Sequence, residues 1–148
     1  MKETSAGAIV FYIENNKPLY LLLYKKARNR YREAYDIPKG NIEANEKPEE
    51  TAKREIKEET GLDVEILSGF KEKLSWFYRR EGKTIYKEAI FFVAQAKSKN
   101  VKISYEHDAY FWLSFDEALA RLRFKNQKEL LRKANEFIKE YLKQKKLV

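Results

Sequence analysis

The sequence predicts an α/β protein in which a mixed β-sheet is sandwiched between α-helices. Apolar runs of strand length recur along the chain, and the strongest of them, residues 84–96, is apolar on both faces. Two other segments have helical character instead: residues 48–60, and a stripe of apolar residues that begins at Leu130. The length of 148 residues fits one domain, residues 1–148.

The first elements are two strands. Residues 5–13 and 18–24 are apolar runs separated by a polar turn, and their composition predicts burial on both faces over much of their length. Residues 25–33 follow as a basic loop, which either contacts phosphates or simply faces water.

The next element is the helix over residues 48–60. Pro48 suits a first helical position, and Gly61 can adopt the left-handed conformation that ends a helix. Ala52 and Ile56 give the helix a small apolar face for docking on a core. No good N-cap side chain precedes Pro48, so we expect the preceding loop to fix the start of the helix.

Strands dominate the middle of the chain. Residues 63–78 alternate as a strand does, with Gly69 as a candidate bulge. Residues 84–96 follow after a turn and are expected at the centre of the sheet. Two shorter extended segments, 101–105 and 109–113, come next.

Helices are predicted to end the chain. Ser114 and Glu117 form a capping box that opens a short helix to about Leu122. The last helix starts near Asn126, and we expect the basic residues 143–146 to fray. Its core-facing stripe comprises Leu130, Ala134, Phe137, Ile138 and Tyr141.

Composition restricts the function classes. The chain contains 31 Lys and Arg against 23 Asp and Glu, a net charge of +8 that favours polyanionic partners such as nucleotides. It has no cysteine, which excludes disulfides and thiolate metal sites. Neither a signal peptide nor a membrane-spanning run is recognisable, so a soluble cytoplasmic protein is expected.

Carboxylates are concentrated on the helix at 48–60. Glu55, Glu58 and Glu59 stand at i, i+3 and i+4, so they share one face and repel one another unless a cation is held there. Hard oxygen ligands suit Mg²⁺ or Mn²⁺ better than zinc. The other reading is a solvated helix surface, in which Arg54 and Glu58 make an ordinary i,i+4 pair.

The spacing around this helix resembles the Nudix box. Gly40, five residues, Glu46, seven residues and then the run from Arg54 to Leu62 fit that motif at every defined position. The resemblance implies the Nudix fold. It also implies an enzyme that uses a divalent metal to hydrolyse a nucleoside diphosphate linked to another moiety.

Three further stretches resemble the asymmetrical diadenosine tetraphosphate hydrolases. They are SAGAIVFY with IPKGNIE, LSWFY followed by IYKEAIFFVA, and YEHDAYFWL with the downstream RFK. This resemblance implies a dinucleoside polyphosphate substrate, cleaved to ATP and AMP. A monomer or weak dimer with no stable nucleic-acid complex is expected.

The resemblance also assigns roles at the metal site. Glu58 or Glu55 would be the base that activates water, and Arg54 would orient a glutamate by a salt bridge. Glu106 would add a late carboxylate from a loop, although it also reads as a surface residue. The implied metal-binding residues are Gly40 (through its carbonyl), Glu55, Glu58, Glu59 and Glu106.

Substrate-binding residues follow from the same resemblance. Lys87 would neutralise a polyphosphate oxygen, and Lys39 has a weaker claim to that role. Trp76 and Phe124 would close on adenine as opposing aromatic side chains, although Trp76 also fits ordinary core packing. Two further aromatic candidates are Tyr78 and Tyr110.

Other functions also fit the sequence. One is an RNA enzyme that removes pyrophosphate from 5′-triphosphate ends, which the positive charge would suit. Another is a non-catalytic nucleotide-binding regulator, although a binder need not keep a repulsive carboxylate cluster. The sole histidine, His107, cannot build a multi-histidine metal site and is either a polar structural residue or a general acid–base group.

Overall fold

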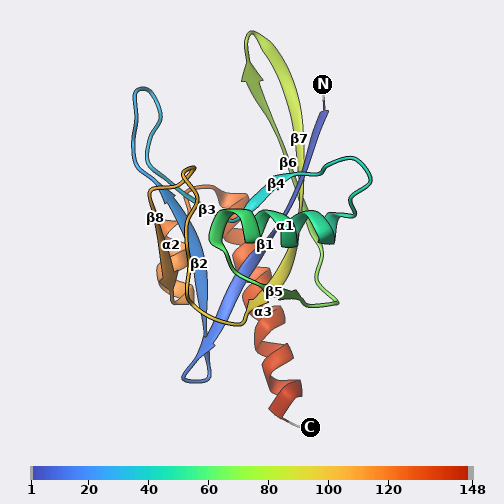
Figure 1. The fold of residues 1–148 in the computed structure, drawn as a ribbon, viewed down its shortest axis with the longest axis vertical. Coiled ribbons are helices and arrows are strands. Elements are labelled where there is room, and N and C mark those ends of the chain that lie inside the picture. Colours follow the sequence, from blue (N-terminus) through green and yellow to red (C-terminus); the bar gives the residue numbers. More distant parts are fainter. Residues whose placement is uncertain (1, 147–148) are drawn as a thin grey trace.

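The computed structural model describes residues 2–146 and contains one eight-stranded sheet flanked by three helices (Figure 1). The order along the main path of the sheet is β3-β2-β1-β7-β5, while β4 pairs with β1, β6 with β7 and β8 with β2. The strands are β1 (Lys2–Glu14), β2 (Lys17–Lys25), β3 (Ala34–Asp36), β4 (Lys39–Asn41), β5 (Val64–Ile66), β6 (Glu72–Arg80), β7 (Lys83–Ala96) and β8 (Ala109–Leu113). The helices are α1 (Pro48–Thr60), α2 (Phe115–Arg121) and α3 (Lys125–Lys146).

The centre of the sheet is the parallel pair of β1 and β7, aligned so that Ser5 faces Ala89. Strand β7 also pairs antiparallel with β5 and β6, so the predicted central position of residues 84–96 is confirmed. Beyond the body of the sheet, β6 and β7 continue as a long hairpin (Figure 1).

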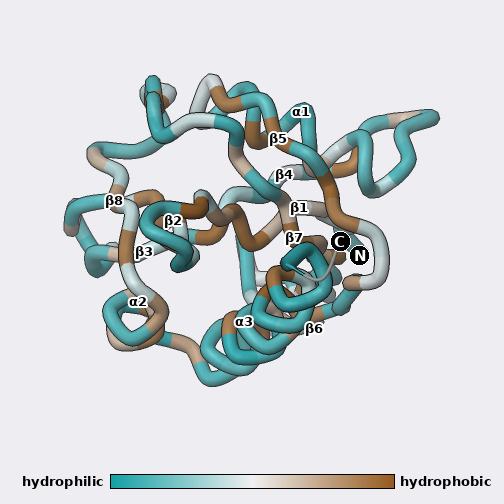
Figure 2. The backbone as a smooth tube through the Cα atoms, turned by 90° about the horizontal axis from the view of Figure 1, so that it is seen from below, coloured by the Kyte–Doolittle hydropathy of each residue, from teal (hydrophilic) through white to brown (hydrophobic). Residues whose placement is uncertain are grey.

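Two hydrophobic cores lie on opposite faces of this sheet, with α1 on one side and α2 and α3 on the other (Figure 2). Ala52 and Ile56 of α1 are fully buried against β1, β2 and β7. On the other face, Leu130, Ala134 and Ile138 of α3 are fully buried, as their helical stripe predicts. The predicted α/β sandwich is therefore confirmed.

The segment 63–78 is two strands rather than one. Gly69 lies between β5 and β6 with φ of 102°, in a turn packed near the Phe137 ring, so the chain turns here and no bulge interrupts a continuous strand. An alternating pattern cannot reveal this break, because both halves bury apolar side chains on the same sheet.

Residues 101–105 are also not a strand. Lys102 N–H donates to the Thr60 carbonyl at 2.9 Å and Ser104 N–H to the Glu59 carbonyl at 3.1 Å. The segment therefore satisfies its backbone at the C-terminal end of α1 instead of in the sheet.

The C-terminal basic residues 143–146 are helical rather than frayed. The Lys145 ammonium group lies 5.1 Å from the centre of the Tyr141 ring, one turn earlier, which supports this last turn. No helix within residues 2–146 is both long enough and apolar enough to cross a membrane.

Candidate active site

Helix α1 is fixed at both ends by its backbone. At its start, Lys47 N–H donates to Glu50 Oε1 at 2.9 Å, which compensates for the missing N-cap side chain. At its end, Gly61 has φ of 74° and donates its N–H to the Lys57 carbonyl at 2.8 Å. The predicted boundaries are confirmed, so the rotation of the helix and the direction of its glutamates are set.

Arg54 connects the preceding loop to the glutamates of the helix. Its Nε donates to Glu46 Oε2 at 2.6 Å, and one terminal nitrogen lies 3.1 Å from both Glu55 Oε1 and Glu58 Oε2. The other terminal nitrogen donates to the Asn41 carbonyl at 3.0 Å. Hydrogen bonds from Arg54 and from the backbone of Glu43 lower the pKa of Glu46 to about 2. This network has the geometry expected of an orienting arginine.

Glu59 is the carboxylate that the fold isolates from water. It is only 6% exposed, and its Oε2 has no hydrogen-bond partner among the described residues. Burial, together with the nearby charges of Glu55 and Glu106, raises the pKa of Glu59 to about 8 against the opposing effect of Lys39. A buried carboxylate with a free oxygen is costly unless a cation or a proton compensates it.

Gly40 brings the backbone of β4 against this helix. A Cβ at Gly40 would lie 2.0 Å from the Glu55 carboxyl carbon and 2.2 Å from its Oε1, so no side chain fits there. The strand is held in place by pairing with β1, in which Ala6 faces Gly40. Burial also raises the pKa of Glu55.

These groups fit a divalent cation. The donor set consists of carboxylate and carbonyl oxygens, which Mg²⁺ and Mn²⁺ prefer, and the unpartnered oxygen of Glu59 needs positive charge. Within residues 2–146, no three acidic or histidine side chains already form a compact ligand group, and Glu55 and Glu58 are hydrogen-bonded to Arg54. A cation would therefore compete with Arg54 for their oxygens.

Two lysines lie next to the carboxylates. Lys87 Nζ is 3.3 Å from Asn41 Oδ1 and 3.6 Å from Glu3 Oε1, at the start of the paired strands. Burial lowers the pKa of Lys39, with the Lys87 charge acting in the same direction and the Asp36 charge opposing it. Two ammonium groups close enough to influence each other would suit an anion.

An aromatic cavity of about 420 Å³ adjoins Lys39. Trp76 and Phe124 line it from β6 and from the residue before α3, as the sequence analysis expected of an adenine site. Trp76 also packs on the core, as the alternative interpretation of this residue expected. Phe77, which is 69% exposed, lines the same cavity and was not predicted from the sequence. Phe77 pairs with Tyr86 across the β6–β7 hairpin, with ring centres 5.0 Å apart and the rings tilted. Its place in the cavity depends on this register, so only the fold shows it.

The two other aromatic candidates lie outside this cavity. Tyr78 donates its hydroxyl to Glu3 Oε1 at 2.7 Å, which ties the hairpin to β1. Tyr110 is on β8, which pairs with β2 on a different part of the sheet from the β6–β7 hairpin. The structure therefore does not bring either ring to the proposed adenine site.

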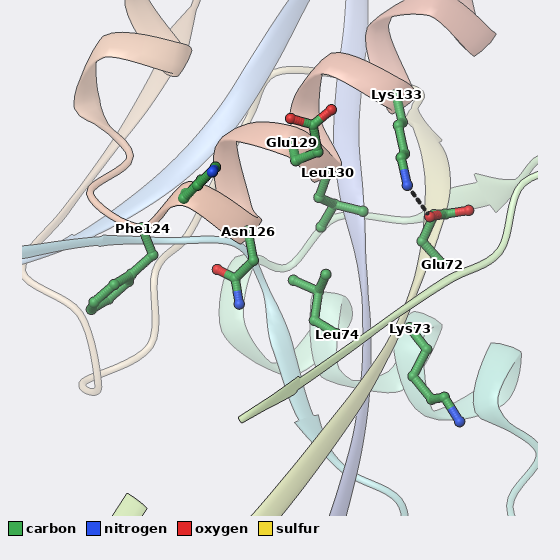
Figure 3. A pocket seen from close by; sticks show the side chains of 9 residues that line it. Glu72, Lys73, Leu74, Phe124, Asn126, Glu129, Leu130 and Lys133 are labelled. Atoms are coloured by element: carbon green, nitrogen blue, oxygen red, sulfur yellow. Dashed lines mark hydrogen bonds and ion pairs between the residues drawn. The ribbon is translucent and has the colours of Figure 1, made fainter. Parts of the chain in front are cut away.

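A second, larger cavity of about 560 Å³ lies between the start of α3 and β6 (Figure 3). Leu74 and Leu130 form its floor, and Lys133 reaches across to Glu72 at 2.9 Å. None of the carboxylates of α1 lines this cavity, so the larger of the two cavities is not the candidate active site. It shares Leu74, Phe124 and Asn126 with the aromatic cavity.

The fold and the segment from Gly40 to Leu62 together define a Nudix domain. The chain belongs to this family, since the family model described as NUDIX domain matches residues 1–134.

Within the family, the chain is similar to asymmetrical bis(5′-nucleosyl)-tetraphosphatases. The Mus musculus protein is 38% identical over 106 residues, which cover 68% of this chain and 69% of that protein. The structure of the C. elegans Ap4A hydrolase in a binary complex superposes with a TM-score of 0.79 at 25% identity, covering 93% of this chain and 98% of that one. The predicted resemblance is confirmed, and the protein is a Nudix pyrophosphohydrolase.

A further relative is the mRNA-decapping protein g5R of African swine fever virus. It is 31% identical over 147 residues, covering 89% of this chain and 58% of that protein.

Proposed function

We propose that this protein hydrolyses diadenosine tetraphosphate, and related dinucleoside polyphosphates, to ATP and AMP with the help of Mg²⁺ or Mn²⁺. The observation that carries the proposal is the continuity of three features: the acidic face of α1, the Lys39–Lys87 pair and the aromatic cavity lined by Trp76 and Phe124. This arrangement of carboxylates, lysines and aromatic rings suits a substrate in which a polyphosphate is attached to a purine nucleoside.

The acidic residues of α1 and Arg54 would bind the metal and activate the water. Glu55, Glu58 and Glu59 would hold divalent cations together with the Gly40 carbonyl and Glu106. Such cations supply neutralisation of phosphate charge and favour the deprotonation of water. Glu58 or Glu55 takes the proton from the attacking water, and Arg54 keeps these carboxylates oriented.

The remaining groups bind and orient the substrate. The ammonium groups of Lys87 and Lys39 would donate to polyphosphate oxygens, where charge accumulates on the leaving group. Trp76 and Phe124 would hold the adenine between them, with Phe77 at the edge. Water attacks a phosphorus near one end of the polyphosphate. The phosphoanhydride bond between that phosphorus and the leaving group breaks, and the leaving phosphate takes the negative charge.

The test is hydrolysis of a panel of dinucleoside polyphosphates in heavy-oxygen water with Mg²⁺. We expect ATP and AMP from diadenosine tetraphosphate, with the label on one product only. Formation of two ADP molecules, or no turnover with any member of the panel, would contradict the proposal.

A second candidate is removal of pyrophosphate or a cap from the 5′ end of RNA. The similarity to the viral mRNA-decapping protein and the net charge of +8 favour it. The same assay with 5′-triphosphorylated and capped RNA separates the two, because the preferred substrate is the one with the larger kcat/KM. A cytoplasmic location and a monomeric or weakly dimeric state stay predictions from the sequence.

A further inference from the structure

His107 is buried beside the candidate active site in an arrangement that the proposed reaction does not use. Its side chain is 5% exposed, and its Nε2 lies 3.3 Å from Asp36 Oδ2. Its Nδ1 is buried without a hydrogen-bond partner in residues 2–146. An apolar side chain would fill the same space without leaving a polar atom unsatisfied, so packing alone does not account for an imidazole here.

The contact joins two segments that are 71 residues apart in the sequence. On one side, Asp36 ends β3, and only Ile37 and Pro38 separate it from β4, which carries Gly40. Ile37 is 4% exposed, so this short connection is anchored in the core. On the other side, His107 directly follows Glu106.

Apart from the His107–Asp36 contact, the segment that carries Glu106 is held at its ends and by a local turn, in which Glu106 N–H donates to Ser104 Oγ at 3.4 Å and His107 N–H donates to the Ser104 carbonyl at 3.3 Å. Ser104 N–H donates to the Glu59 carbonyl at 3.1 Å, and Asp108 N–H donates to the Tyr24 carbonyl at 2.8 Å. The Asp108 carboxylate also accepts from Arg28 at 2.6 Å. Glu106 itself is exposed, and its negative charge acts on Glu55 and Glu59, which repel it.

We infer that His107 is a positioning residue: through Asp36 it fixes Glu106 relative to Gly40 and the glutamates of α1. The inference rests on the proposed metal site, because it gives Glu106 a place in that site. Without the contact, repulsion from Glu55 and Glu59 would move Glu106 outward, and cation binding would first have to bring it back. Partners that orient metal ligands typically change metal affinity or activity by roughly 10–100-fold when they are removed.

The test compares His107→Leu and His107→Gln in the full chain. Leucine keeps the core filled but cannot donate to Asp36, whereas the glutamine amide nitrogen reaches the position of Nε2. We expect His107→Leu to lower both the affinity for Mn²⁺, measured by electron paramagnetic resonance of the free ion, and kcat with diadenosine tetraphosphate by roughly 10-fold or more. The KM for the nucleotide should change less than kcat, because the Trp76 and Phe124 side chains that line the aromatic cavity are not altered.

His107→Gln should recover most of the Mn²⁺ affinity and of kcat. Tyr105→Ala is the matched control, since Tyr105 belongs to the same segment but is 96% exposed, and it should leave both unchanged. Wild-type values for His107→Leu, or equal losses in the leucine and glutamine variants, would overturn the inference.

Two further arms keep the test decisive. If His107→Leu does not fold, His107→Asn replaces it, because the asparagine amide occupies the position of Nδ1 and cannot reach Asp36. Equal Mn²⁺ affinity in the asparagine and glutamine variants would then overturn the inference. If the wild-type protein does not cleave diadenosine tetraphosphate, the proposed function fails, but the Mn²⁺ measurements still decide the role of His107.

Discussion

Replacing Gly40 with alanine adds one methyl group at the place where β4 meets α1. The new carbon would lie 2.0 Å from the Glu55 carboxyl carbon and 2.2–2.3 Å from both carboxylate oxygens. Ordinary contact begins at about 3.4 Å, so the carboxylate has to move by more than about 1 Å. Gly40 does not have a positive φ, so alanine causes no backbone strain of its own.

The effect on activity should be large and the effect on stability small. A displacement of about 1 Å at a catalytic group costs roughly 100-fold in rate. The displaced group is the end of a flexible side chain. Alanine also lowers the conformational entropy of the unfolded chain, which stabilises the folded state by about 0.4–1 kcal/mol. We therefore expect kcat to fall by roughly 100-fold while the free energy of unfolding changes by less than about 1 kcal/mol.

The assay is steady-state hydrolysis of diadenosine tetraphosphate with Mg²⁺, together with denaturant unfolding. Gly82→Ala is the matched control: it has φ of 75°, and an added Cβ meets nothing within 4 Å. It should lose roughly 1–2 kcal/mol of stability through its left-handed backbone and keep its kcat. The reasoning is refuted if folded Gly40→Ala retains near-normal turnover.

Three other predictions concern the same site. Glu58→Gln should reduce kcat by orders of magnitude, whereas Glu49→Gln, an exposed change in the first turn of α1, should not; near-normal turnover of the Glu58 variant would remove it from the reaction. Trp76→Ala should raise KM more than it lowers kcat, because a stacked base contributes roughly 1–3 kcal/mol. The KM of Trp76→Phe should lie between those of the wild type and Trp76→Ala, and an unchanged KM in the alanine variant would place adenine elsewhere. Mg²⁺ at about a hundred times its dissociation constant should stabilise the fold by about 2.7 kcal/mol, and EDTA should abolish this stabilisation. A melting temperature that is the same with and without Mg²⁺ would argue against a cation among these glutamates.

The local sequence was sufficient to predict the elements whose signals are short-range. Helix α1 could be placed from Pro48 and Gly61 because backbone restrictions act at single residues. The capping box of Ser114 and Glu117 is likewise complete within four residues, and it forms as expected. The long apolar strand β7 could be placed at the centre because it needs partners on both sides.

The candidate site was only partly predictable. The acidic helix and Arg54 could be found by spacing alone, and the structure brings Trp76 and Phe124 to one cavity. In contrast, Tyr78 and Tyr110 are aromatic residues of the same kind that lie elsewhere, because strand register decides which rings meet.

What the sequence determined by itself is the chemistry available: a helix with repelling carboxylates, a glycine before it at the spacing of the Nudix box, and lysines and aromatic residues of the kinds that suit a nucleotide. The tertiary structure alone decided which of these groups lose contact with water. The three-residue strands β3 and β4 form only because long strands offer them partners, and in doing so they bring Asp36 to His107. Burial of Glu59 likewise depends on neighbours from distant parts of the chain, and the resulting cost of an isolated negative charge is the reason for proposing a cation at this helix.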